Sequence, residues 1–393
     1  MFKEFEGYIE NRHQAVREWK AKTGKEVFGY FCCVAPEEMI YGADILPVRI
    51  TGSSSPTGQV DDHIPRFGCP FVRSALDLAL SGTYDYLDGV VIPHTCDLVG
   101  RMEYWWRTLA SSRSPTIAGL EICPYVIYLN YPTKVDGKEA FRLYRTELGQ
   151  LRQYLERKKR IVLSDDRLEK ALQVYREHFS LMEKVHELRK EEPPLFSGYE
   201  AWEIEFSSLL MPKEEHSRIL RNILERVQRP GGRERKTRLF LSGGAMDQEN
   251  SLLYRIIEES GGQIVSEDIS CHSSFHMKEL PAELSPIDAI ALRSLSVPCP
   301  RSTWSDPIPM KRWQWVKGKI EGWKVEGVIF FSLNYCDCRA LEFPLFKERI
   351  LQTFGIPVLF LDGDYTKEGL EQLRGKIETF VEMVRERDDF HGD

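Results

Sequence analysis

The sequence lacks the features that would assign it to several large classes of protein. No apolar run approaches the ~18 residues that a membrane-spanning helix needs. The N-terminal stretch MFKEFEGYIENRHQAVREWK is charged and amphipathic, unlike a secretory signal. An excess of basic residues is also absent, because 53 Lys and Arg stand against 60 Asp and Glu, a net charge of −7. We therefore expect a cytoplasmic protein with no membrane and no nucleic-acid partner.

Short metal and nucleotide motifs are missing too. There is neither a paired CxxC set nor a CxxCxxC run, which argues against a zinc ribbon and a bacterial ferredoxin motif. No GxxxxGKS/T loop occurs, so we expect ATP to be hydrolysed on a partner rather than on this chain. The nine cysteines are an odd number in a chain without an export signal, which does not match a disulfide framework. They are therefore core residues, catalytic thiols or metal ligands.

What the sequence does contain is an ordinary globular composition with a repeated pattern of strands and helices. Its 393 residues, 42% of them apolar, allow two or three domains with sizeable cores. Short apolar runs alternate with helical spacing near both ends of the chain, and this alternation predicts parallel α/β units. The predicted strands lie within residues 26–36, 45–52, 87–97, 123–132, 237–244, 263–271, 325–338 and 356–365.

The predicted organisation has four parts. Residues 1–25 are expected to form an N-terminal helix, and residues 26–136 a first α/β lobe. Residues 137–229 carry long charged stretches with helical spacing and few strand-like runs, so they predict a helical segment. After a Pro/Gly-rich basic linker, residues 235–393 repeat the α/β pattern as a second lobe. LDGVVIPHTCD in the first lobe and VEGVIFFSLNYCD in the second are alike, which is consistent with duplication.

Six cysteines fall at the ends of these elements rather than inside them. In open α/β sheets ligands bind beyond the carboxyl ends of the strands, and four of the six stand there. Dispersed thiolates are soft ligands that suit an iron–sulfur cluster held between lobes. The alternative is that each is a small buried core residue, as we expect for Cys123. The six are Cys32, Cys69, Cys96, Cys271, Cys299 and Cys336.

Several motifs resemble those of one enzyme family. GYFCCVAPEEMIYGADILPVRITG resembles its opening motif, with a cysteine before a Pro-Glu-Glu helix start and a later Pro-Val-Arg. RFGCPFVRSALDLAL, VVIPHTCDLVGRMEYW and GVIFFSLNYCDCRALEFPLFKERI resemble its second, third and last elements, in that order. The family is that of the 2-hydroxyacyl-CoA dehydratase D-component and benzoyl-CoA reductase, and the resemblance covers most of the chain. It implies an α/β fold of two Rossmann-like parallel-sheet lobes with a helical segment between them.

The resemblance also implies an iron–sulfur cofactor and an electron donor. Family members receive low-potential electrons from a separate ATP-hydrolysing activator protein, itself an iron–sulfur dimer. In the dehydratases three cysteines of each subunit hold one 4Fe–4S cluster, and here these would be Cys32, Cys96 and Cys336. The double-cubane branch, a homodimer, holds two bridged 4Fe–4S units and resembles all six cysteine positions, so this branch is favoured. The neighbours Cys33 and Cys338 are alternative ligands in place of Cys32 and Cys336.

Three functions remain open on this basis. The first is a double-cubane low-potential reductase with a small-molecule substrate. The second is a subunit of a 2-hydroxyacyl-CoA dehydratase or benzoyl-CoA reductase, completed by a paralogous subunit as a heterodimer and acting on an acyl-CoA. The third is a non-catalytic iron–sulfur carrier or scaffold. Candidate catalytic residues are Glu37 and His94, as proton donor and proton relay, and His272, as a residue lining the substrate cavity. Glu37 also fits a helix-capping role and His94 a solvated loop.

Overall fold

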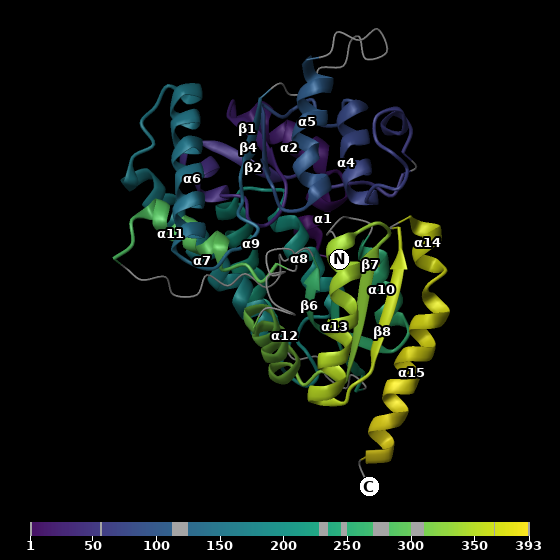
Figure 1. The fold of residues 1–393 in the computed structure, drawn as a ribbon. Coiled ribbons are helices and arrows are strands. Elements are labelled where there is room, and N and C mark those ends of the chain that lie inside the picture. The colour runs from purple at the N-terminus through teal and green to yellow at the C-terminus, as the bar shows by residue number, and fades with distance from the viewer. Residues whose placement is uncertain are drawn as a thin grey trace.

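Two parallel β-sheets of four strands each organise the described part of the chain (Figure 1). This computed structural model describes residues 2–55, 57–111, 125–227, 235–244, 250–269, 283–299, 310–364 and 366–391. Every expected strand is confirmed. The strands are β1 (Glu26–Tyr30), β2 (Ile45–Arg49), β3 (Gly89–Pro93), β4 (Val126–Leu129), β5 (Thr237–Gly243), β6 (Gly262–Ile269), β7 (Gly327–Leu333) and β8 (Val358–Gly363).

Both sheets have the same strand order, which confirms the expected α/β class. The first sheet runs β2–β1–β3–β4 and the second β6–β5–β7–β8, with all neighbours parallel. We call each sheet with its flanking helices a lobe, lobe one and lobe two in chain order. In each lobe the order reverses between the first and the third strand. The carboxyl ends of those two strands flank the usual place for a ligand in an α/β sheet.

Helices flank both sheets and connect the two lobes (Figure 1). None of the described helices is both long and apolar enough to cross a membrane. In chain order the helices are α1 (Lys3–Glu10), α2 (Arg12–Thr23), α3 (Glu37–Gly42), α4 (Pro70–Leu80), α5 (Asp97–Ser111), α6 (Lys138–Lys159), α7 (Asp165–Leu188), α8 (Gly198–Ser208), α9 (Lys213–Arg226), α10 (Asn250–Glu259), α11 (Pro286–Leu295), α12 (Met310–Gly322), α13 (Asp337–Phe354), α14 (Lys367–Glu371) and α15 (Arg374–His391), with a 3-10 turn, η1 (Gln59–Asp62).

The N-terminal stretch forms two helices where the sequence predicts one. α1 ends at Asn11, whose backbone (φ −118°, ψ 36°) leaves the helical region before α2 begins. An asparagine side chain competes with the helix for backbone hydrogen bonds, which favours this residue at helix ends. α1 buries Phe5 and Ile9 and packs against α8, so the break turns α1 towards the middle of the molecule.

The stretch between the sheets is helical, as predicted, and joins the two lobes through one apolar core. It contains α6, α7, α8 and α9, and α8 begins with a capping box between Ser197 and Glu200. The largest core cluster includes Val27 of β1, Trp202 of α8 and Leu239 of β5. Burial of apolar surface therefore holds the lobes and the helices together as one unit.

α11 lies between β6 and β7 in the sequence but packs against α6 and α7, on the side of lobe one (Figure 1). The hydroxyl of Tyr131 donates to the Ser294 carbonyl oxygen over 2.9 Å, and Arg145 pairs with Asp288. Ile290 of α11 belongs to the same core cluster as β1 residues of lobe one. A segment from the second half of the chain thus completes the surroundings of the first sheet.

Candidate metal centre

Three of the expected cysteines stand immediately before the first turn of a helix. Cys69 and Cys336 are the N-cap residues of α4 and α13, and Cys96 directly precedes α5. The backbone N–H of Val99 points at the Cys96 Sγ over 3.5 Å. First-turn N–H groups have no partner within their helix, and the positive end of the helix dipole lies there. Each position therefore stabilises a thiolate to some extent, in opposition to the effect of burial.

Cys32 and Cys33 follow β1 at the same end of the sheet at which Cys96 follows β3. Cys32 adopts a left-handed backbone conformation with φ 61°, and its Sγ lies 3.9 Å from the Cys33 Sγ. Tyr335, the residue before Cys336, is also left-handed with φ 59°. Such conformations are costly for residues with a side chain and persist only where the surroundings hold them. Both segments are therefore held in fixed, strained shapes.

Thiols of the two lobes interact electrostatically. Burial, followed by the neighbouring Cys338 thiol, raises the pKa of Cys96 to about 12, and Cys336 and Cys32 add to this effect. Burial also raises the pKa of Cys69 well above its usual value, as do the Cys336 and Cys96 thiols. Each thiol must lose its proton to bind a metal. Cys96 and Cys336 pack on one core cluster and Cys32 on another, and the Cys96 thiol is close enough to interact with both of the other thiols.

Cys299 reaches the lobe-one side of this neighbourhood. It packs on the same core cluster as Cys32, in the segment that follows α11. Tyr131 lies close to both: burial raises the pKa of its hydroxyl, and the Cys299, Cys33 and Cys32 thiols raise it further. The path of α11 into lobe one is what brings this cysteine, distant in sequence, to the others.

The donor set fits an iron–sulfur group better than a single metal ion. The described part of the chain contains seven cysteines that form no disulfide, drawn from both lobes. Three thiolates on one zinc ion would lie about 3.8 Å apart, as tetrahedral Zn–S bonds require. Within the described ranges no three thiols lie within even 4.8 Å of one another. Soft thiolate ligands at wider spacing, with backbone N–H groups around them, suit a cluster of several irons.

Glu37 lies in the first turn of α3 and is buried. The Lys213 Nζ is 3.1 Å from the Glu37 Oε2, and the Tyr175 hydroxyl donates to the same oxygen over 3.4 Å. Tyr30 interacts with both Glu37 and Cys33, which places the carboxylate on the side of lobe one that carries the thiols. A carboxylate held in this way can exchange a proton with a neighbouring group. Nothing in the sequence around Lys213 marks it as the partner of Glu37.

His94 packs against the start of α5. A Cβ added at Gly100 would lie 2.4 Å from the His94 ring, which is also 5.9 Å from the Tyr128 ring. The imidazole is therefore fixed between α5 and β4 rather than turning freely in solvent. The remaining predicted residues lie outside the described ranges; they are Cys123, Cys271 and His272.

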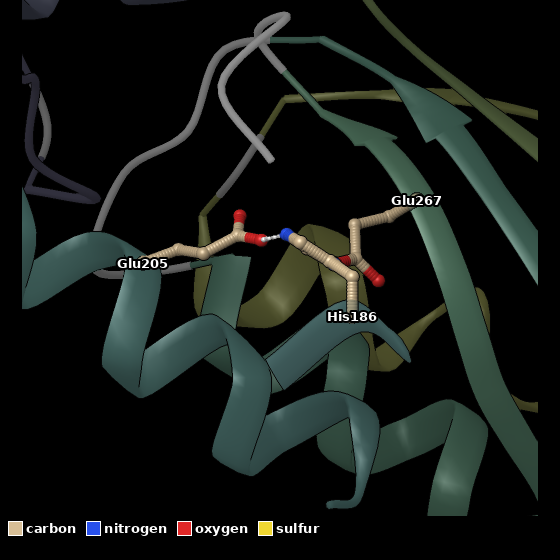
Figure 2. A group of neighbouring side chains, drawn as sticks. All are labelled: His186, Glu205 and Glu267. Atoms are coloured by element: carbon tan, nitrogen blue, oxygen red, sulfur yellow. Dashed lines mark ion pairs between the residues drawn. The ribbon is translucent and has the colours of Figure 1, made fainter. Parts of the chain in front are cut away.

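A separate polar group, not predicted from the sequence, lies where α7, α8 and β6 meet (Figure 2). His186, Glu205 and Glu267 are buried, and their ligand atoms lie within 4.8 Å of one another. The His186 Nε2 is 3.0 Å from a Glu205 oxygen. Arg189 donates to both oxygens of Glu267, one of them over 2.5 Å. The Arg189 guanidinium therefore occupies both carboxylate oxygens of Glu267, on the side that a metal ion would otherwise use.

The charges of this group are balanced without a metal ion. Burial raises the pKa of Glu205, and the nearby Glu267 raises it further. Burial lowers the pKa of Lys319 to about 8, an effect that Glu267 opposes. The cations Arg189 and Lys319 thus face the two carboxyl groups, and a divalent ion would add uncompensated charge to a buried place. We assign the group to the junction between the helices and lobe two.

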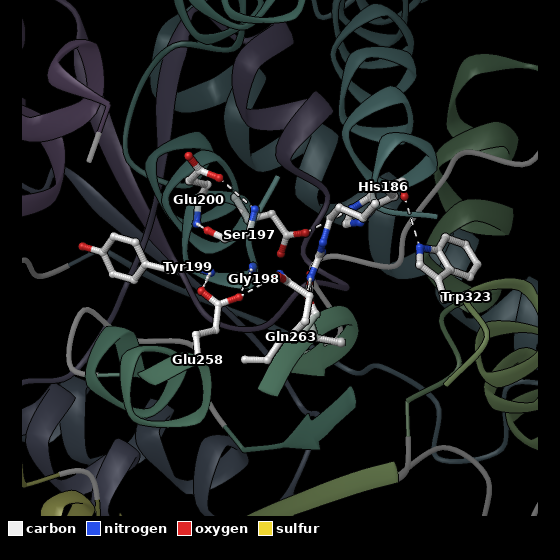
Figure 3. Close-up of polar contacts among 12 residues, drawn as sticks. His186, Ser197, Gly198, Tyr199, Glu200, Glu258, Gln263 and Trp323 are labelled. Atoms are coloured by element: carbon white, nitrogen blue, oxygen red, sulfur yellow. Dashed lines mark hydrogen bonds and ion pairs between the residues drawn. The ribbon is translucent and has the colours of Figure 1, made fainter. Parts of the chain in front are cut away.

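The same junction extends to the start of α8 (Figure 3). Glu258 accepts the backbone N–H of Gly198 over 2.6 Å and that of Tyr199 over 3.4 Å, so a carboxylate caps this helix. The indole N–H of Trp323 donates to the His186 carbonyl oxygen over 3.1 Å. These bonds fasten α7 and α8 to lobe two and leave the thiol site as the candidate for chemistry.

The sequence matches known proteins over nearly its whole length. The family model for 2-hydroxyglutaryl-CoA dehydratase, D-component, matches residues 32–384. The (R)-phenyllactyl-CoA dehydratase beta subunit of Clostridium sporogenes is 27% identical over 98% of each chain. A benzoyl-CoA reductase subunit of Thauera aromatica is 24% identical over 94% of each chain, and the (R)-2-hydroxyglutaryl-CoA dehydratase beta subunit of Acidaminococcus fermentans is 21% identical over 98% of this chain. The resemblance in the motifs is therefore confirmed, and this chain belongs to the 2-hydroxyglutaryl-CoA dehydratase D-component family.

Proposed function

We propose that this chain is the iron–sulfur subunit of an acyl-CoA dehydratase or reductase, with the cluster held at the lobe boundary by Cys32, Cys96 and Cys336. The observation that carries the proposal is the meeting of thiols from both lobes, in which Cys96 interacts with Cys32 and Cys336. The names of the relatives, dehydratase and reductase subunits, support the same assignment.

The residues of this chain would hold the cluster, shield it from water and transfer protons to or from the substrate. When bound, the cluster supplies a low-potential electron to the acyl-CoA. The helix N-termini at Cys69, Cys96 and Cys336 would help to stabilise thiolate forms, and the Val99 N–H lies 3.5 Å from the Cys96 Sγ. The thiols are partly exposed in the single chain, so a partner subunit would complete the exclusion of water. Glu37, kept in place by Lys213, would pass a proton to or from the substrate, with His94 and His272 as further candidates. Electrons would come from a separate ATP-hydrolysing iron–sulfur activator.

A second candidate, the double-cubane reductase, is favoured by the position of Cys69. Its thiol interacts with Cys336 and Cys96, and Cys299 packs on the core cluster that includes Cys32. A single 4Fe–4S cluster held by three cysteines does not use these further thiols. In this case the protein would be a homodimer with a bridged pair of clusters in each chain.

A partner subunit would cover the face around the thiols. Large apolar side chains are exposed on the segments that carry the cysteines, and exposed groups of this kind mark interaction sites. Relatives of this chain are named as subunits, which supports a paralogous partner in a heterodimer. The exposed residues are Phe67, Tyr104, Tyr335 and Leu341.

Iron and sulfide analysis of protein purified without oxygen tests the proposal. About four irons per chain would support one cluster, and about eight the double-cubane form. Cys96→Ala and Cys336→Ala should each lose the brown cluster absorbance, while Cys123→Ala, expected to alter only a core position, should keep it. Full iron content in both of the first two variants would refute the ligand assignment. Wild-type protein without iron, even after reconstitution, would indicate a scaffold role instead.

A further inference from the structure

Four charged side chains form a buried network in lobe two. Asp268 is the penultimate residue of β6, Arg312 belongs to α12, and Arg339 and Glu342 stand in the first two turns of α13. Arg312 donates to Asp268 over 2.7 Å and to Glu342, and Arg339 donates to Asp268 and to Glu342, each over 3.2 Å. The exposed fractions of the four residues are between 1% and 7%, so water contributes little to their solvation.

The network ties together the end of β6, the segment before Cys299 and the start of α13. Arg339 donates to the main-chain oxygen of Asp268 over 3.1 Å, at the end of the strand that leads to the Cys271 segment. Arg312 donates to the Pro298 carbonyl oxygen over 2.9 Å, immediately before Cys299. Arg339 itself lies three residues after the Cys336 N-cap, one turn into the same helix. Two arginines therefore fix the relative positions of three segments that are far apart in the sequence.

Arg339 is also tied directly to Cys336. Its backbone N–H donates to the Cys336 carbonyl oxygen over 3.1 Å, in the first turn of the helix that Cys336 caps. The guanidinium of Arg339 and the carboxylate of Glu342, which it binds over 3.2 Å, are both buried. The field of such buried charges is little screened by solvent.

Stability alone does not account for such a network. A buried ion pair gains little over apolar side chains of the same size, because removing the charges from water costs about as much as their attraction returns. This one stands beside a candidate ligand, where charge has a chemical use. The reduction potential of an iron–sulfur cluster depends on local charge and on the hydrogen bonds to its sulfurs.

We propose that Arg339, held by Arg312, Asp268 and Glu342, is a positioning residue that fixes Cys336 and sets the reduction potential of the cluster bound there. This inference rests on the iron–sulfur function proposed above. Reduction adds negative charge to the cluster, so a nearby guanidinium favours the reduced form and makes the potential more positive. The carboxylate of Glu342 has the opposite effect, and the two residues therefore predict shifts of opposite sign.

Reductive titration of the anaerobic protein, followed by visible absorbance and electron paramagnetic resonance, measures the potential independently of activity. Arg339→Gln should shift it to more negative values, and Glu342→Gln, which keeps the shape of the side chain, to more positive values. Arg339→Lys keeps the charge and should stay close to the wild type. Arg189→Gln is the matched control, because it breaks another buried arginine–carboxylate pair, the one with Glu267 of β6. Its potential should not move.

The outcomes separate this inference from the proposed function. A wild-type protein that never binds iron overturns both. A wild-type cluster whose potential is the same in Arg339→Gln and Glu342→Gln overturns this inference alone. If Arg339→Gln does not fold, Glu342→Gln decides the question: a positive shift supports the inference, and no shift or a negative one overturns it. Equal shifts in Arg189→Gln and Arg339→Gln would also overturn it, because they would show a general effect of breaking buried pairs.

Discussion

His216 gives the most quantitative stability prediction because it is completely buried and kept neutral. Burial, with Lys213 adding to the effect, lowers its pKa to about 3, although a bond to the Ile204 carbonyl oxygen acts against this. The ring nitrogen lies 2.9 Å from that oxygen, and the Phe5 ring of α1 stacks on the imidazole at 5.0 Å between centroids. Acid should therefore weaken the docking of α1 onto the helices beneath it.

The sign and size of the effect follow from proton linkage. An unfolded histidine titrates near pH 6.5, whereas the folded His216 titrates near pH 3. Between these two pH values the unfolded state binds one more proton than the folded state, so acid favours unfolding. The contribution of His216 to stability is thus complete above pH 6.5 and is lost as the pH falls towards 3. Between pH 7 and pH 5 the loss is roughly 25-fold in the unfolding equilibrium, or about 2 kcal/mol.

Amide hydrogen exchange over α1 and α9, corrected for the intrinsic exchange rate at each pH, measures this loss locally. Wild-type protection should fall by roughly 25-fold between pH 7 and pH 5 on account of this residue. His216→Gln keeps an N–H group that can reach the Ile204 oxygen but does not titrate, so its protection should depend less on pH by about the same factor. The same pH dependence in the variant and the wild type would show that His216 is not the acid-sensitive group.

Two further predictions concern packing and buried charge, and both are measured by denaturant unfolding. Gly100→Ala puts a methyl group 2.4 Å from the His94 ring and should cost about 1–3 kcal/mol, whereas Gly149→Ala, with no atom within 4 Å, should be neutral or gain up to about 1 kcal/mol. Equal changes in the free energy of unfolding for the two variants would contradict the close contact between Gly100 and His94. Glu38→Gln leaves the guanidinium of Arg293 buried without its carboxylate and should cost about 3–5 kcal/mol. A loss below about 1 kcal/mol would mean that this pair is open to water.

The positions of the strands could be predicted from the sequence because each is a short apolar run with clear ends. Their order could not, since it depends on which strand edges meet: Phe28 pairs with Pro47 on one side and with Gly89 on the other. The position of α11 in the fold could not be predicted from the sequence either. It stands between two strands of lobe two in the sequence, yet Ile290 buries its side chain in the core of lobe one. Only the packing of the whole chain decides that.

The sequence predicts a cysteine site because strand ends on one edge of a parallel sheet come together, and the ligand assignment stays a prediction. The charged residues around it could not. In a helical sequence, Arg339 and Glu342 have the spacing of an ordinary solvated ion pair, three residues apart. What makes them buried is the contact with Asp268, 71 residues before Arg339, and this contact has no local signature. For the same reason the sequence did not indicate the pairing of Glu37 with Lys213.

Both lobes contribute thiols to the site, and α11 links the two lobes. Lobe one supplies Cys32, whose loop is fixed by Arg293 of α11 through a bond of 3.2 Å to the Ala35 carbonyl oxygen. The chain then continues to the Pro298 carbonyl oxygen, which Arg312 of lobe two binds. A movement of lobe two would therefore act on the Cys32 loop through this connection as well as moving Cys336 directly. A single lobe produced alone would lack both the opposing thiols and this support, so the site requires the whole chain.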